Sequence, residues 1–134
     1  MITETDERVN TSIYIDEFKE VAQHAMNYIR INFMDLAEPP RIRGYSNTFN
    51  AHKVMKEFDR LISKHGFEID GRTLKHAHGI GNNNEWEVVD KNIEKVGYFS
   101  SVDNMYQGVA LSVKVRGERI DGFEICSGGF IREF

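Results

Sequence analysis

Two histidines one residue apart are the side chains in this sequence with the clearest capacity for chemistry. His76 and His78 lie on the same face of any β-strand that contains them. Two neighbouring imidazoles can ligate a metal ion or bind a phosphate group. They can equally be polar side chains beside Lys75, and no histidine follows them to complete a ligand set. We therefore predict no metal and no cofactor, and retain both histidines as candidate ligand- or partner-binding residues.

Other reactive side chains do not form a complete catalytic set. Cys126, the single cysteine, could act as a nucleophile with a histidine as base, but a lone cysteine on a strand is typical of a small core residue. Glu85, Glu87 and Asp90 lie on one hairpin arm, where cross-strand ion pairs are expected rather than an acid–base pair. The sequence contains no P-loop, zinc-finger spacing or nucleophile elbow. No catalytic residue is assigned.

The charged residues are distributed unevenly along the chain. The 134 residues include 17 Lys and Arg against 21 Asp and Glu, a net charge of −4, which excludes a strongly basic nucleic-acid-binding protein. This average conceals a basic centre, because residues 41–80 hold eight bases and four acids. The flanking blocks, 1–40 and 81–134, are both net acidic. An anion-binding surface is therefore predicted in the central block.

Part of the basic centre follows a helical spacing. At 100° per residue, four bases fall within an arc of about 80° on the side opposite the apolar side chains. These four are Lys53, Lys56, Arg60 and Lys64. Arg41 and Arg43 come just before this predicted helix, and a helix N-terminus with flanking bases can hold a phosphate or carboxylate. The alternative is the ordinary solvated face of an amphipathic helix.

Two helices are predicted before the first strand. Apolar periodicity indicates a helix over residues 13–34, which ends before a Pro-Pro pair. A second helix is indicated over residues 50–65, with Gly66 as the left-handed residue that ends it. Residues 1–12 are polar, and we expect a loose arm there. Residues 13–134 would then form a single domain.

The periodicity changes from 3.6 to 2 after the second helix, which indicates strands. The strand periodicity begins from Phe67, with clear alternation over 73–80, and the further predicted strands are 85–89, 96–100, 109–115 and 120–126. Glycine- and asparagine-rich turns such as 81–84 join neighbouring strands as hairpins. The predicted fold is α+β, with two N-terminal helices packed on one face of a four- to five-stranded antiparallel meander sheet. The other face would be solvated or covered by a partner, including a second copy in a homodimer.

The longest polar connection within the strand region carries a candidate contact residue. Residues 100–108 include Met105 and Tyr106 in an otherwise polar segment. Tyrosine and methionine exposed on a loop suit a protein interface, although both could fold back onto the core. Tyr106 is therefore included among the candidate partner-binding residues.

The sequence indicates a cytoplasmic protein. Its acidic N-terminus lacks the basic start and apolar stretch of a signal peptide. No apolar run approaches the roughly 18 residues of a membrane span. A single cysteine provides no disulfide framework. We expect no insertion into a membrane.

These features favour a small non-enzymatic binding or regulatory module over an enzyme. Such a module would act through a protein partner, or through an anionic ligand or nucleic-acid backbone held at the basic centre. Small size and segregated charge are typical of regulators and inhibitors, including short proteins of viral genomes. The alternative is a small phosphate-handling enzyme that uses His76 and His78. Its substrate would be held by Arg41, Arg43 and Lys53, in a cleft shared with the histidines.

Overall fold

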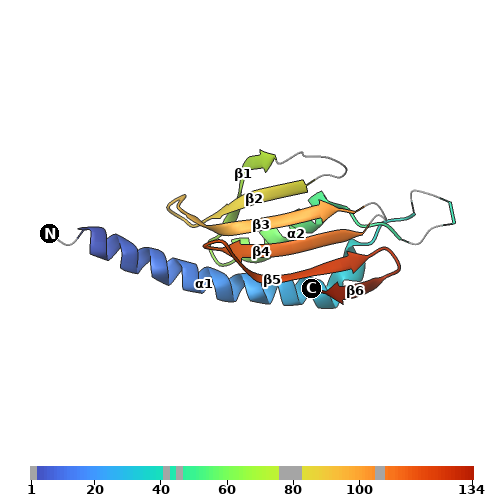
Figure 1. Cartoon of the computed structure of the whole chain (residues 1–134), viewed down its shortest axis with the longest axis horizontal. Helices are drawn as coiled ribbons and strands as arrows, with labels where there is room; N and C mark the ends of the chain where they lie inside the picture. The colour runs from blue at the N-terminus through green and yellow to red at the C-terminus, as the bar shows by residue number, and fades with distance from the viewer. Residues whose placement is uncertain (1–2, 41–42, 45–46, 76–82, 105–107) are drawn as a thin grey trace.

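The computed structural model describes most of the chain and shows helices followed by strands (Figure 1). The described residues are 3–40, 43–44, 47–75, 83–104 and 108–134. The elements follow one another along the chain as α1 (Thr3–Asn32), the 3-10 helix η1 (Phe33–Leu36), α2 (Ala51–Ser63), β1 (Glu68–Lys75), β2 (Asn83–Val89), β3 (Lys95–Asp103), β4 (Val109–Val115), β5 (Glu118–Cys126) and β6 (Phe130–Glu133).

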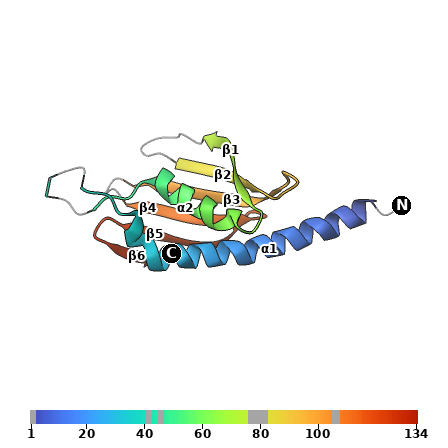
Figure 2. The ribbon, with the colours of Figure 1, turned by 180° about the vertical axis from the view of Figure 1, so that it is seen from behind.

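The six strands form one antiparallel sheet in the order β1-β2-β3-β4-β5-β6. Both α-helices lie on the same face of this sheet, as the views from the two sides show (Figures 1 and 2). The predicted α+β fold, with helices that precede an antiparallel meander, is confirmed. The sheet has one strand more than the four to five expected, because the short tail that follows Gly129 pairs with β5 as β6.

Helix α1 begins earlier than its periodicity indicated. It starts at Thr3, so residues 3–12 are helical and not the loose arm that their polar composition predicted. These residues contain neither glycine nor proline, and adding a residue to an existing helix costs far less than starting one. The first turns of α1 project beyond the end of the sheet (Figures 1 and 2). The N-terminal end of this helix therefore extends past the packed layers.

Helix α2 is bounded by two local signals in the sequence. The side chain of Asn50 accepts hydrogen bonds from the backbone amides of His52 and Lys53, which caps the N-terminus of the helix. Gly66 adopts φ +87° just after its C-terminus, as predicted, in a conformation that glycine reaches without strain. Strand β1 begins at Glu68, one residue after Phe67, from which the strand periodicity was predicted. Residues 76–80 of the predicted alternation lie outside the described residues.

The hydrophobic core lies between the two helices and the sheet. Phe58 of α2 stacks on Phe99 of β3, with ring centroids 4.1 Å apart and an angle of 11° between the ring planes. Phe18 of α1 packs against Phe67 at a centroid distance of 5.4 Å. Along β4, every second residue is buried, as the period of two predicted. The core therefore holds α2 flat against the centre of the sheet.

The stacked pair gives a test of this packing. Phe58 is fully buried, so we expect Phe58→Ala to lower the free energy of unfolding by about 3–5 kcal/mol. Phe130 is 56% exposed at the edge of the sheet, and Phe130→Ala should change it by no more than about 0.5 kcal/mol. Urea unfolding followed by circular dichroism measures both. Equal losses for the two variants would contradict the packing described.

Candidate functional site

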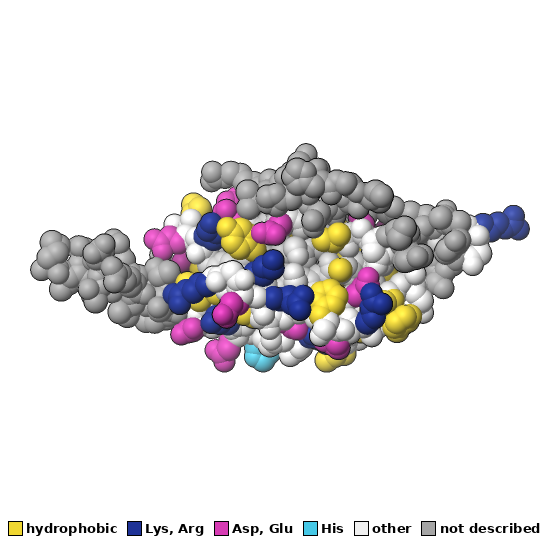
Figure 3. Space-filling view, viewed as in Figure 1, with side chains coloured by type: hydrophobic (Ala, Val, Ile, Leu, Met, Phe, Trp, Pro, Cys, Tyr) yellow, Lys and Arg dark blue, Asp and Glu magenta, His cyan; other side chains and the backbone are white. Residues whose placement is uncertain are grey.

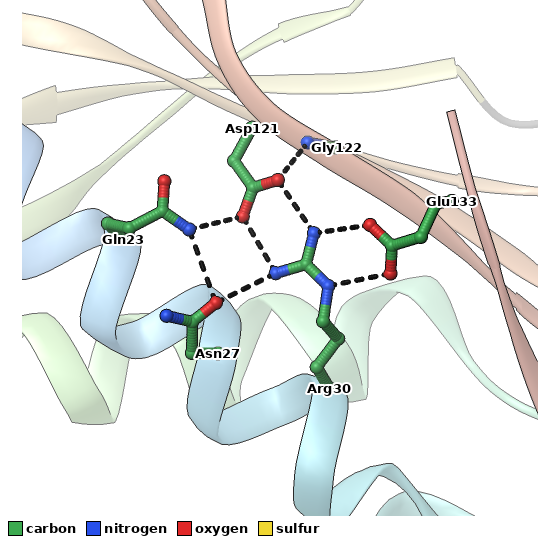
Figure 4. A network of polar contacts seen from close by, with 6 residues as sticks. All are labelled: Gln23, Asn27, Arg30, Asp121, Gly122 and Glu133. Atoms are coloured by element: carbon green, nitrogen blue, oxygen red, sulfur yellow. Dashed lines mark hydrogen bonds and ion pairs between the residues drawn. The ribbon is translucent and has the colours of Figure 1, made fainter.

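Arg30 is the centre of the densest polar network in the described residues (Figure 4). Its two terminal nitrogens donate to the two carboxylate oxygens of Asp121, at 2.7 and 2.9 Å. Nε and Nη2 donate to the two oxygens of Glu133, each at 2.8 Å, and Nη1 also donates to Asn27 at 2.9 Å. All five N–H groups of the guanidinium are thus used within the protein. Arg30 is therefore a structural clamp and not an anion-binding residue.

This clamp ties the end of α1 to the last two strands. Asp121 lies on β5 and Glu133 on β6, and the guanidinium also sits 4.3 Å from the ring centroid of Phe123. Burial raises the pKa of Asp121, but hydrogen bonds from Arg30 and Gln23 outweigh it, so the net pKa lies below its usual value. The hydrogen bond from Arg30 also lowers the pKa of Glu133. The clamp therefore depends on both carboxylates being ionised.

The lowered pKa values predict a loss of stability in acid. A carboxylate whose pKa is lower in the folded state stabilises the fold above its unfolded pKa of about 4, and this contribution disappears as the pH falls through the folded value. We expect Asp121→Asn to cost about 2 kcal/mol at pH 7 and progressively less below about pH 4. Urea unfolding from pH 7 to pH 2.5 measures this.

The exposed carboxyl of Glu20, on α1, provides a matched control for this experiment. Glu20→Gln removes one negative charge, as Asp121→Asn does, and should leave the wild-type acid dependence unchanged. If Asp121→Asn retained that full dependence too, the proposed role of the clamp would be wrong.

The four predicted bases of α2 lie together on its outer surface. All four side chains are exposed, on the side of the helix opposite its buried residues. They are Lys53, Lys56, Arg60 and Lys64. From the first to the last, they extend over about 16 Å of helix at 1.5 Å per residue. We call these four residues the basic stripe.

The members of the basic stripe differ in how they are paired. Arg60 forms an ion pair with Glu57, which raises the pKa of Arg60, and its guanidinium lies 6.0 Å from the ring centroid of Tyr28 on α1. Within the described part of the chain, the three lysines have no ion-pair partner. Glu57 and Tyr28 thus hold the Arg60 side chain in place. The ammonium groups of the three lysines are available to solvent or to a partner.

The N-terminus of α2 does not offer free amides to an anion. Asp103 accepts a hydrogen bond from the amide of Ala51 at 3.0 Å, and Asn50 accepts from those of His52 and Lys53 at 2.8 and 3.1 Å. The carboxylate of Asp103 adds a negative charge where a phosphate was predicted to bind. The donors that a phosphate would need here already bind the protein itself.

Of the remaining predicted site residues, only Arg43 lies within the described residues. Arg43 is exposed in the turn before α2. Arg41, His76, His78 and Tyr106 lie outside the described residues. The described residues therefore do not test the cleft required for a phosphate-handling enzyme. Over the ranges that the structure describes, no three His, Cys, Asp or Glu side chains gather to hold a metal ion.

Two of the three candidate acids, Glu87 and Asp90, and the cysteine have structural partners. Glu87 pairs across strands with Lys95 at 3.6 Å, as predicted for this hairpin arm. Asp90 instead accepts hydrogen bonds from the amides of Asn92 and Glu94 in the β2–β3 turn. Burial, followed by the charge of Glu124, raises the pKa of the Cys126 thiol. A raised pKa disfavours the thiolate that a nucleophile requires.

A shallow cleft of about 310 Å³ lies where the α2–β1 turn meets the β2–β3 turn. Its lining residues are Ser63, Gly66, Phe67, Glu68, Asp90 and Lys91. The charged residues of this lining are Glu68, Asp90 and Lys91, and Asp90 already accepts hydrogen bonds from its own turn. The cleft therefore carries no argument for a defined ligand.

Comparisons of the chain with protein-family models, curated proteins and solved structures found no match. Among the helices in the described ranges, none has both the length and the apolar character needed to cross a bilayer. The arguments about function therefore rest on the geometry of the described surfaces, of which the basic stripe is the most strongly charged.

Proposed function

We propose that this protein is a non-enzymatic binding module that holds an acidic partner protein on the outer surface of α2. The observation that carries this proposal is the exposure of the whole basic stripe, in which three lysines lack ion-pair partners among the described residues. A row of cations about 16 Å long fits an extended or helical run of carboxylates better than a small, compact ligand.

Exposed apolar side chains on α1, of which Tyr28 lies beside Arg60 of the basic stripe, favour a protein partner over a nucleic-acid backbone. Tyr28, which contacts Arg60, is 43% exposed, and Ile31, one turn further along α1, is 79% exposed. Exposed apolar groups beside a charged row suit an amphipathic acidic segment, whose apolar side chains they can cover. The phosphate groups of a nucleic-acid backbone would bury no apolar surface against Ile31. By covering an acidic surface of its partner, the module would act as a regulator or inhibitor.

The basic stripe gives a direct binding test. The probe is a fluorescein-labelled peptide with glutamates and leucines at helical spacing, and binding to the full chain is followed by fluorescence anisotropy. We expect Lys56→Glu to weaken binding about tenfold, because it removes one attraction and adds one repulsion. The matched control is Lys19→Glu, an exposed lysine on α1, which should change the affinity by less than about twofold. Added salt should weaken the wild-type complex.

Equal effects of the two lysine variants would contradict the proposal. Ile31→Ser distinguishes the two classes of partner, because it should weaken binding of the peptide and leave binding of a single-stranded DNA of similar charge unchanged. Tighter binding of the DNA than of the peptide would identify a nucleic-acid backbone as the partner and overturn the assignment to an acidic protein.

A further inference from the structure

The outer face of the sheet, opposite the helices, is a second surface available to a partner. The helices cover only one face, and Figure 3 shows the other with hydrophobic and charged side chains intermixed. Large aromatic side chains contribute to it. Phe130 and Phe134 are each 56% exposed, and Tyr98 lies at the middle of β3 with Lys95 over its ring. A sheet face that contacts only solvent is expected to be polar, so these exposed aromatic side chains indicate a surface that contacts a partner.

The centre of the outer face is flat because its side chains are small. Ser100 and Ser112 are directly opposite each other on β3 and β4, and their hydroxyl oxygens lie 2.9 Å apart. On β5, Gly122 lies directly opposite Ser112 of β4. Ala110, two residues before Ser112 on β4, faces the same side of the sheet. A Cβ at Gly122 would come within 2.8 Å of the Phe134 ring, which rests on this glycine. The floor is therefore flat at β3 and β4 and is bounded at β5 by the Phe134 ring, so another sheet can approach closely over these two central strands.

The charges on the outer face are arranged in order across the strands. In one cross-strand row the register runs from Glu87 on β2 to Tyr98 on β3, Lys114 on β4 and Arg119 on β5. The acid therefore lies at one end of the row, where Lys95 of β3 is within 3.6 Å of it, and the bases lie at the other end. In the described residues neither Lys114 nor Arg119 has an ion-pair partner. Arg119 lies instead 5.0 Å from the ring centroid of Phe134.

We propose that the outer face is the interface of a homodimer, in which a second copy packs face to face about a two-fold axis parallel to the strands. If this axis passes between β3 and β4, it places β2 of one copy over β5 of the other. Glu87 then meets Arg119 of the second copy, and Tyr98 meets Lys114 of the second copy. Both contacts occur twice, as a two-fold interface requires. The row of charges is thus complementary to itself.

The size of the outer face is consistent with a weak but specific dimer. Five strands about 4.8 Å apart and about seven residues long give a flat face of roughly 20 Å by 23 Å. Two such faces would bury about 900 Å² in total, and side chains that project from the sheets add to this area. Specific interfaces bury at least about 1,000 Å² in total. In such a dimer both helical layers face outward, so two basic stripes are presented on opposite sides. The dimer would therefore be bivalent toward acidic partners.

Sedimentation equilibrium of the full chain, over a range from micromolar to millimolar concentration, tests the interface. We expect the wild type to dimerise and Ser112→Arg to remain monomeric, because it places a long charged side chain at the centre of the flat floor. The matched control is Ser63→Arg, the same change at an exposed position of α2, which should dimerise like the wild type. A wild type that is monomeric throughout, or a dimer that tolerates Ser112→Arg, would overturn the proposal.

A charge exchange tests the orientation of the two copies. Glu87→Arg and Arg119→Glu should each weaken the dimer at least tenfold, and the double variant should restore it. The restoration must act between copies, because the two residues are separated by about 14 Å across the sheet of one copy. Failure of the double variant to dimerise would exclude this two-fold arrangement. Lys56→Glu should leave the dimer intact, so loss of partner binding at α2 is distinguishable from loss of the interface.

Discussion

The placement of both helices on one face of the sheet is the constraint on which the other features of this structure depend. It encloses a single core between the two layers, where Phe58 stacks directly on Phe99. Because α2 is held flat by its buried side, its basic side must point away from the protein. Because none of the helices in the described residues covers the opposite side of the sheet, Tyr98 and Phe134 remain accessible there. The two surfaces assigned to partners are thus consequences of how the core is closed.

The basic side chains of this protein differ in whether their charge is paired within the fold. Arg30 donates every N–H to carboxylates and an amide, and it holds α1 against β5 and β6. Arg60 is intermediate, since it is paired with Glu57 on its own helix. Lys56 has no ion-pair partner among the described residues, so its charge contributes nothing specific to the fold that they show. Charge alone does not identify a binding residue. Exposed charge without a partner is the better criterion.

The features predicted from the sequence are those that depend on neighbouring residues. The alternation along β4 and the left-handed Gly66 were identifiable because each is encoded within a few positions. The Arg30 clamp was not, because its two carboxylates lie 91 and 103 residues further along the chain. The phosphate site predicted at the start of α2 did not allow for Asp103, which comes 52 residues after the amide that it accepts from. Strand β6 is short and was identifiable only through its pairing with β5.

The separation between the two proposed partner surfaces explains how an acidic protein can carry a basic site. The basic stripe and the outer face lie on opposite sides of a helix layer packed on a sheet, and packed layers are about 10 Å apart. The side chains that project from each layer increase this distance. Charges in solvent are screened over about 8 Å at physiological ionic strength, so the field at Lys56 depends on its own helix more than on Glu87 or Lys114. The net charge of −4 therefore does not prevent local attraction of an acidic partner. It also follows that the proposed dimerisation and the proposed partner binding can be tested independently by substitutions on one surface at a time.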